Sequence, residues 1–152
     1  MSKPDNFSFV TDHVAGFALP STKENIQYLA ETENIKHIFT MCEDKPPVES
    51  FGDKITLHYN PVEDNTPPSY EKLNSIVEEI LAAEAKGEKC GVHCFLGLGR
   101  AGTILACYLA VKKNLKTGDE AIDLLRSMRE GSITSSSQAR AINDFVEKRN
   151  SK

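Results

Sequence analysis

Residues 93–103 read HCFLGLGRAGT, and this stretch restricts the fold more than any other part of the chain. Residues 97–102 have the spacing G-x-G-x-x-G, which is typical of loops that hold the phosphates of a dinucleotide. Cys94 and Arg100 enclose the first glycines of that pattern, with five residues between them. Either pattern works only if a strand leads into the loop and a helix begins at its end. We therefore expect a strand, an anion-binding loop and a helix, in that order.

The dinucleotide interpretation fails on the segment after the loop. It requires a second strand that ends in an acidic residue about 20 positions on, where the carboxylate can bind a ribose. Asp119 and Glu120 lie at that distance, but they begin an amphipathic helix, and the chain has no further strand–helix–strand unit beyond it. A lone G-x-G-x-x-G is a weak signal. The sequence therefore predicts no dinucleotide and no other cofactor.

The spacing of Cys94 and Arg100 indicates a loop that binds a phosphate group directly. The residues between them, FLGLG, contain no proline, so every backbone N–H is available, and the glycines let the chain curl around one anion. The following helix adds its own unpaired N–H groups. Arg100 can bind two phosphate oxygens with its planar guanidinium. We predict that the phosphate contacts come from Phe95, Leu96, Gly97, Leu98, Gly99 and Arg100.

The positive potential of this loop also acts on Cys94. A thiolate is favoured where positive charge converges, which would make Cys94 a nucleophile at neutral pH without a separate base. The alternative is an ordinary buried cysteine, but the setting favours the nucleophile. No C-x-x-C pair occurs among the four cysteines, which argues against a zinc or thioredoxin-type site, so no metal is predicted.

The rest of the chain predicts an α/β domain. Ser21, Ser69, Thr117 and Ser135 each precede an apolar pattern with helical spacing, and all but Ser69 have Glu or Gln three residues later, as a capping box requires. A fifth helix is predicted over 102–113, which is apolar on most sides. Residues 1–152 should form one domain, in which a small central mixed sheet is flanked by helices. Strands are predicted over residues 7–10, 35–41, 55–59 and 90–93.

Charge and hydropathy limit the partners of the chain. A formal net charge of −4 leaves no basic surplus to neutralise a nucleic-acid backbone. No apolar run approaches the roughly 18 residues of a membrane span, and the start of the sequence has no hydrophobic signal region. We expect a reduced intracellular protein that binds neither nucleic acid nor membranes and is a monomer. Its expected location is the cytoplasm, and its small size leaves the nucleus open to it as well.

The stretch HCFLGLGRAGT resembles the signature H-C-x5-R-[ST]-G of the protein tyrosine phosphatase superfamily. The resemblance extends over most of the chain, through NFSFV, AGFALP, ITLHYNPVEDNTPP, GVHCFLGLGRAGTILACYLA and GSIT, and is strongest to the small atypical dual-specificity phosphatases. It implies a cysteine phosphatase fold. It also implies metal-independent hydrolysis of phosphotyrosine, and of phosphoserine or phosphothreonine, in phosphorylated proteins or peptides through a phosphocysteine intermediate.

The resemblance assigns further roles to residues outside the loop. Members of the family carry an aspartate about 30 residues before the nucleophile that acts as general acid and base, and Asp64 stands at that distance from Cys94. Its neighbour Glu63 is the alternative. The family histidine at the position of His93 orients the loop. Gln138 matches a glutamine that positions the hydrolytic water in related enzymes, and it is equally explained as the capping-box partner of Ser135.

One position departs from the family pattern. The signature has Ser or Thr after the arginine, where its hydroxyl stabilises the departing thiolate, and this chain has Ala101. We therefore hypothesise that breakdown of the phosphocysteine is slow. Thr103 lies two residues along and is expected to face elsewhere.

Other residues near the motif have less specific interpretations. Glu43 and Asp44 could hydrogen-bond Arg100, although we interpret them as part of a solvated loop. Cys90 could form a protective disulfide with Cys94, although a core position is expected.

Three other classes of protein stay open. The first is a phosphate-binding pseudophosphatase, the second is a nucleic-acid or phosphoinositide phosphatase on the same fold, and the third is a sulfur-transfer or arsenate-reducing enzyme. The loop interior carries no Lys or Arg to hold additional phosphates, and this favours a phosphorylated amino-acid side chain as the substrate.

Overall fold

The structure, a computed structural model, describes residues 2–151 and is built around a five-stranded sheet. The strand order is β1-β2-β5-β3-β4. β1 runs antiparallel to β2, and the other pairings are parallel, so the sheet is mixed, as predicted. The strands are β1 (Ser8–Phe9), β2 (Val14–Phe17), β3 (Ile35–Thr40), β4 (Thr56–Tyr59) and β5 (Lys89–His93).

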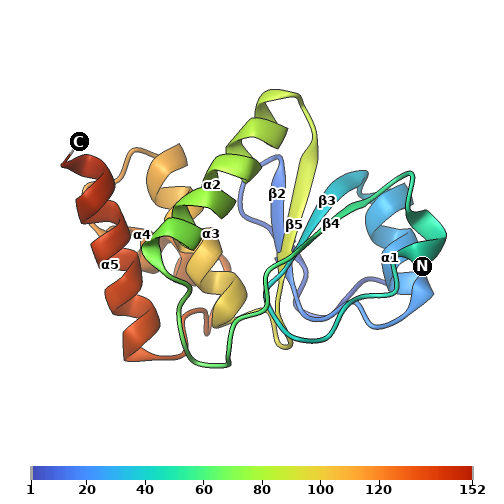
Figure 1. Cartoon of the computed structure of the whole chain (residues 1–152), viewed down its shortest axis with the longest axis horizontal. Coiled ribbons are helices and arrows are strands. Elements are labelled where there is room, and N and C mark those ends of the chain that lie inside the picture. The colour runs from blue at the N-terminus through green and yellow to red at the C-terminus, as the bar shows by residue number, and fades with distance from the viewer. Residues whose placement is uncertain (1, 152) are drawn as a thin grey trace.

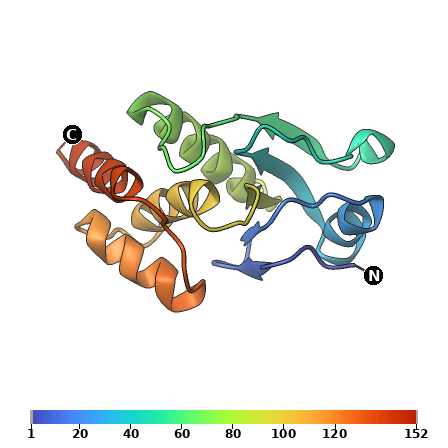
Figure 2. The same cartoon turned by 90° about the horizontal axis from the view of Figure 1, so that it is seen from below.

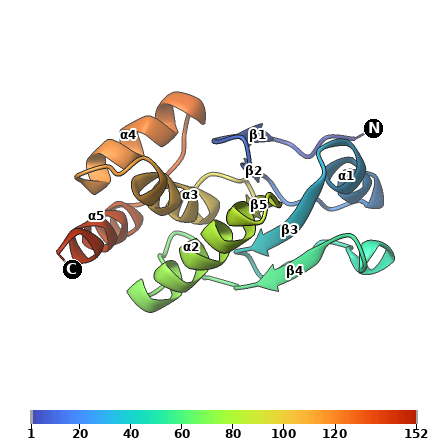
Figure 3. The ribbon, with the colours of Figure 1, turned by 90° about the horizontal axis from the view of Figure 1, so that it is seen from above.

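Helices cover both faces of the sheet. In Figures 1 and 3, α2, α3, α4 and α5 lie on one side of the strands and α1 on the other. The buried side chains form two clusters that correspond to these two faces. No helix in residues 2–151 combines the length and the apolar character that a membrane crossing requires. The helices are α1 (Lys23–Gln27), the π-helical turn η1 (Tyr28–Thr32), the 3-10 turn η2 (Glu49–Phe51), α2 (Tyr70–Ala85), α3 (Arg100–Lys112), α4 (Gly118–Met128) and α5 (Ser136–Asn150).

Most of the predicted element boundaries are confirmed. Ser69, Thr117 and Ser135 are the N-caps of α2, α4 and α5, and the last two form capping boxes. The prediction for Ser21 is wrong by one residue, because the box at α1 is formed by Thr22 and Asn25. The central helix begins two residues earlier than predicted, at Arg100, and is buried on nearly every side from there to Ala110.

The sequence prediction missed β2. Its residues, Val14–Phe17, are all buried, because the strand lies between β1 and β5 with helices over both faces. A strand of this kind shows no alternation of apolar and polar residues, which is the usual signal for a strand in sequence.

The parallel strands bring three chain segments to one edge of the sheet. Thr40 at the end of β3 is in register with His93 at the end of β5, and Tyr59 of β4 is in register with Thr40. The segments that come after these strands therefore leave the sheet side by side. In Figure 1 the green loop after β4, the yellow turn after β5 and the orange-red turn before α5 all lie at the lower edge, and Figure 2 views the molecule from that side.

A chain of hydrogen bonds attaches the edge strand β4 to its neighbours. His37 on β3 and His58 on β4 contact each other through Nδ1 and Nε2 at 3.0 Å. The outer ring nitrogen of His37 lies 2.9 Å from Glu88, and that of His58 lies 3.0 Å from Glu79 on α2. The four side chains therefore form one continuous row.

Candidate active site

The loop of residues 94–100, here called the anion loop, has its backbone carbonyls turned outward. The carbonyl of Phe95 accepts from the Leu19 amide at 3.0 Å, that of Leu98 from the Ile133 amide at 3.0 Å, and that of Gly99 from Thr103. The carbonyls of Leu96 and Gly97 accept from the side chains of Asn6 and Arg129.

Because the N–H and C=O of a peptide point in opposite directions, this arrangement leaves the amides facing the loop interior. Within residues 2–151, the amides of residues 95–100 have no protein acceptor. A ring of unpaired N–H donors before a helix N-terminus is an anion site. The predicted phosphate-binding residues 95–100 surround this anion site, and their binding of phosphate stays a prediction.

Glycines are required at two positions of the anion loop. Gly97 has a φ of +80°, and a Cβ there would lie 2.6 Å from the carbonyl carbon of Phe17. At Gly99 a Cβ would collide with the Thr134 hydroxyl. The glycines thus serve loop curvature and close packing, and not a dinucleotide pyrophosphate.

Cys94 lies at the floor of this loop, buried, with its Sγ 3.3 Å from the Ala101 amide nitrogen. Ala101 supplies no hydroxyl at that point. The hydroxyl of Thr103 donates to the Gly99 carbonyl at 2.8 Å and is therefore not available to the sulfur, as expected.

Arg100 is held from three directions. Its Nη1 donates to Glu43 at 3.2 Å and to the Val62 carbonyl at 2.9 Å, and its Nε lies 3.6 Å from Asp64. The contact confirms that Glu43 hydrogen-bonds Arg100, and with 66% of its side chain exposed Glu43 also belongs to a solvated loop, as interpreted. Nε is buried without a hydrogen-bond partner in residues 2–151, so its N–H remains available beside the pocket.

The pocket that contains Cys94 measures about 120 Å³. Asp64 lines it, whereas Glu63 does not, and the side chain of Asp64 is 71% exposed. The Asn65 amide donates to Asp64 at 2.9 Å and fixes that carboxylate. The complete lining is Asp64, Asn65, Cys94, Phe95, Leu96, Leu98, Gly99, Arg100 and Thr134.

His93 connects the loop to β3. Because a carbonyl can only accept, Nδ1 donates to the Cys94 carbonyl at 3.3 Å, and the opposite nitrogen, Nε2, accepts from the Thr40 hydroxyl at 2.8 Å. The ring also stacks on Phe17. Burial lowers the pKa of His93 from 6.5 to about 4, and the nearby Arg100 adds to this effect. These contacts suit a neutral ring that orients the loop.

The lowered pKa of His93 predicts a dependence of stability on pH. Between pH 6.5 and pH 4 the unfolded chain binds a proton at this residue that the folded chain does not bind, so stability falls as the pH falls. The loss should approach roughly 3 kcal/mol near the lower limit. The free energy of unfolding, measured with urea at several pH values in this range, should fall less steeply with pH for His93→Gln than for the wild type. Equal slopes would contradict the prediction.

Gln138 is buried beside the anion loop and is the capping-box partner of Ser135 at the start of α5. Its Oε1 accepts from the amides of Thr134 and Ser135, so the capping interpretation is confirmed. Its Nε2 has no hydrogen-bond partner in residues 2–151. A donor therefore remains for a water molecule, and the water-positioning interpretation stays a prediction.

The remaining cysteines are core residues. Cys90 lies on β5 and is buried, and burial raises its pKa to about 12. Burial also raises the pKa values of Cys42 and Cys107. None of the four cysteines forms a disulfide. Among residues 2–151, no group of His, Cys, Asp and Glu side chains is arranged to hold a metal ion.

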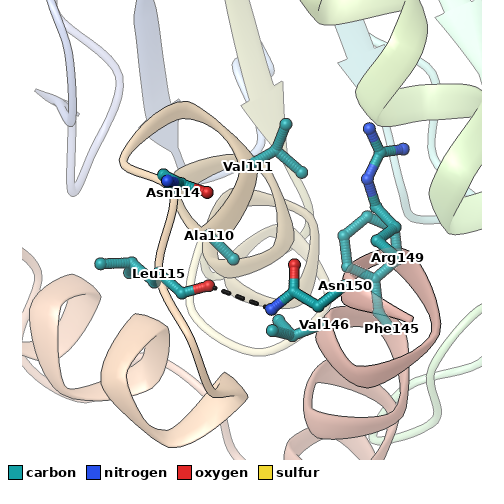
Figure 4. Close-up of a pocket in the computed structure, with 8 residues that line it drawn as sticks. All are labelled: Ala110, Val111, Asn114, Leu115, Phe145, Val146, Arg149 and Asn150. Carbon is teal, nitrogen blue, oxygen red and sulfur yellow. Dashed lines mark hydrogen bonds between the residues drawn. The ribbon is translucent and has the colours of Figure 1, made fainter. Parts of the chain in front are cut away.

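A second hollow, of about 190 Å³, lies at the other end of α3 (Figure 4). It separates that helix from α5, and the Asn150 side chain donates to the Leu115 carbonyl across it. The guanidinium of Arg149 is turned toward α2, where it pairs with Glu78 at 3.0 Å. This hollow contains no cysteine and lies a whole helix length from Cys94, so it takes no part in the chemistry of the loop.

Comparison with known families decides which kind of loop this is. The family model described as Swiss Army Knife protein, DSP-PTPase phosphatase domain, matches residues 4–142. The chain belongs to this family. It is therefore a cysteine-dependent phosphatase domain of the dual-specificity and tyrosine phosphatase type.

Individual relatives agree with this assignment. Protein tyrosine phosphatase PRL-1 of Leishmania major is 31% identical over 143 residues, which cover 86% of this chain and 80% of that protein. Cyclin-dependent kinase inhibitor 3 of Homo sapiens is 30% identical over 95 residues, 62% of this chain, and the match spans only 45% of that protein. The fold of PTPMT1, solved with PI(5)P, superposes with a TM-score of 0.86 at 24% identity, covering 97% of this chain and 98% of that one.

Sequence reasoning did not anticipate several residues at the site. Asn65 and Thr134 line the pocket, and Arg129 binds the back of the loop. The only sequence signal for Arg129 is an arginine at the end of an amphipathic helix, a position that normally faces solvent.

Proposed function

We propose that this phosphatase hydrolyses phosphotyrosine, and phosphoserine or phosphothreonine, in proteins or peptides, through a phosphocysteine on Cys94 and without a metal. The observation that carries the proposal is the placement of Cys94 beneath unpaired amides, with Arg100 and Asp64 at the same pocket. We also propose that the protein is a monomer in the cytoplasm or the nucleus.

In the first step the Cys94 thiolate attacks phosphorus. The S–P bond forms as the bond from phosphorus to the leaving oxygen breaks, and Asp64 gives that oxygen its proton. The loop amides and Arg100 bind the three non-bridging oxygens, where charge is concentrated in the transition state.

In the second step water attacks the phosphocysteine. Asp64, now ionised, takes a proton from the water, the S–P bond breaks, and phosphate and the thiolate are released. The free Nε2 of Gln138 is the candidate donor to this water. The departing sulfur has the Ala101 amide as its donor and no hydroxyl from that residue.

The pocket favours a protein substrate over a phosphoinositide. Phe95 and Leu96 are 55% and 62% exposed, and Arg100 is the sole basic residue of the pocket lining. A headgroup with several phosphates would find no further cation there, whereas an apolar rim suits a phosphorylated side chain. A panel of phosphopeptides and phosphoinositides tests this choice, and preferential release of phosphate from the lipids would overturn it.

The intermediate itself can be observed. Wild-type protein is mixed with p-nitrophenyl phosphate in the presence of a chelator, quenched in acid and analysed by mass spectrometry. We expect one added phosphoryl group on the peptide that contains Cys94. Turnover without this adduct, or turnover lost on chelation, would contradict the proposed chemistry.

Replacing Asp64 with asparagine should slow the first step by roughly 10²- to 10⁴-fold for alkyl and phenyl phosphates, because their leaving oxygen needs a proton. The decrease in rate should be smaller for p-nitrophenyl phosphate, because its leaving group departs more readily as an anion. Glu63→Gln is the matched control, since that neighbour does not line the pocket. A larger loss in Glu63→Gln than in Asp64→Asn would show that Glu63, and not Asp64, is the acid.

Replacing Ala101 with serine should raise the steady-state rate, because the added hydroxyl can stabilise the departing thiolate in the second step. We expect an increase of several-fold, about what one hydrogen bond of roughly 1 kcal/mol contributes. Rapid-quench measurements should show less accumulated phosphocysteine in Ala101→Ser. An unchanged or lower rate would show that breakdown does not limit turnover.

A further inference from the structure

Arg129, at the C-terminal end of α4, is a buried cation without a counter-ion. Its residue is only 3% exposed, and none of its partners within residues 2–151 is a carboxylate. Burial of a charge is costly unless the charge is paired and hydrogen-bonded, and the Nε of Arg129 has no hydrogen-bond partner within residues 2–151. Nη1 donates to the Asn6 carbonyl at 2.7 Å, to the Ser8 hydroxyl at 2.8 Å and to the Gly16 carbonyl at 3.0 Å, and Nη2 donates to the Gly97 carbonyl at 2.7 Å.

The structure makes space for this guanidinium. A Cβ at Gly16 would lie 3.0 Å from the Cζ of Arg129 and 2.6 Å from Leu105, so a side chain at that point of β2 would displace the cation. Gly16 is in register with Val92 of β5, the strand that leads into the anion loop. Arg129 therefore joins the β1–β2 edge to the loop from the side opposite the pocket.

Its contact with Gly97 differs from the other contacts to the loop. The carbonyls of Phe95, Leu96 and Leu98 accept from neutral donors, whereas that of Gly97 accepts from a cation. A charge-assisted bond is shorter and stronger than a neutral one. It also polarises the peptide between Gly97 and Leu98, whose N–H faces the loop interior.

The cation also lies within electrostatic reach of the nucleophile. Burial lowers the pKa of Arg129, and attraction by Cys94 opposes that shift. The interaction is mutual, so Arg129 adds positive potential at the sulfur from behind the loop.

We propose that Arg129 is a positioning residue for catalysis: it locks the Gly97 carbonyl outward and supplies a second positive charge behind the anion loop, which stabilises the Cys94 thiolate and a bound oxyanion. It does not touch the substrate. This inference rests on the proposed function, because it concerns the same nucleophile and the same anion site.

The test uses two readouts that need no turnover. One is the rate at which iodoacetamide alkylates Cys94 at about pH 6, where an ordinary cysteine is almost entirely a thiol. The other is the concentration of tungstate that half-protects Cys94 from alkylation, which reports oxyanion binding. Peptide mass spectrometry separates alkylation of Cys94 from alkylation of the other three cysteines.

The variants are chosen to separate positioning from simple loss of stability. Arg129→Met removes both the charge and the planar set of N–H donors of the guanidinium. Arg129→Lys keeps the charge but loses that planar set of donors. Leu125→Ala, one turn earlier in the same helix, removes a buried side chain that makes no polar contact with the loop. Ser8→Ala removes one acceptor of Arg129 and leaves the Gly97 contact intact.

We expect Arg129→Met to slow alkylation and to raise the half-protecting tungstate concentration, each by roughly tenfold. Arg129→Lys should preserve most of the alkylation rate and lose tungstate affinity, while Leu125→Ala and Ser8→Ala stay near the wild type. If Arg129→Met does not fold, the inference is tested by Arg129→Lys alone, and a tungstate affinity equal to that of the wild type would contradict it. Values for both Arg129 variants equal to those of Leu125→Ala would overturn the inference. A wild-type Cys94 that is neither reactive nor protected would instead overturn the proposed function.

Discussion

Replacing Cys94 with serine is expected to abolish phosphatase activity, with a loss of at least roughly 10⁴-fold in kcat. A serine hydroxyl at this position is not ionised at neutral pH, whereas the unpaired amides around Cys94 favour a thiolate. The loop and Arg100 stay in place, so the variant should still bind phosphopeptides. Release of p-nitrophenol in the presence of a chelator gives the rate, and fluorescence titration with a phosphopeptide gives the affinity.

Cys90→Ala is the matched control for this experiment. Cys90 lies on β5, the strand that leads to Cys94, and is buried as well, and burial raises its pKa to about 12, so it is a thiol at neutral pH. Its replacement should leave kcat within a few-fold of the wild type. If Cys94→Ser retained more than a small fraction of the activity, or if the two variants lost activity equally, Cys94 would not be the nucleophile.

Arg100→Lys should lower kcat/KM by roughly 10²- to 10³-fold although the charge is conserved. Lysine offers a point charge and cannot reproduce the planar fork that meets two phosphate oxygens at once. It also cannot donate simultaneously to Glu43 and to the Val62 carbonyl while facing the pocket. Separate measurement of kcat and KM, together with inhibition by tungstate, shows whether binding and chemistry are both affected.

Arg149→Lys is the control for this substitution. That arginine pairs with Glu78 on α2, at the opposite end of α3 from the anion loop, and its replacement should leave both constants near the wild type. An Arg100→Lys variant with wild-type kcat/KM would show that charge alone suffices and that the fork has no role.

The parts of the site that the sequence could predict are those whose chemistry is local. A cysteine, five residues and an arginine between a strand and a helix define the anion loop, because the backbone amides of neighbouring residues do the binding. Asp64 could be placed only through the family resemblance, since its distance in sequence carries no geometric information.

The parts that could not be predicted depend on contacts between distant segments. Arg129 reaches Asn6 and Gly97, and Glu43 reaches Arg100, although each pair is far apart in sequence. Strand β2 was not predicted because it is buried on both faces, so its sequence lacks the alternation of apolar and polar residues that indicates a strand. At α1, Thr22 took the capping position because its side chain and that of Asn25 satisfy each other's backbone amides.

Each contact in the side-chain row that attaches β4 needs one hydrogen atom on a histidine ring. The row consists of Glu88, His37, His58 and Glu79. Its three contacts need three ring hydrogens, one toward each carboxylate and one between the rings, but two neutral imidazoles carry only two. The complete row therefore stores one additional proton. Burial lowers the pKa of His58, so the environment of that ring disfavours holding the additional proton. Once it is lost, two lone pairs face each other across 3.0 Å, and the edge strand gives up one of its attachments to the sheet.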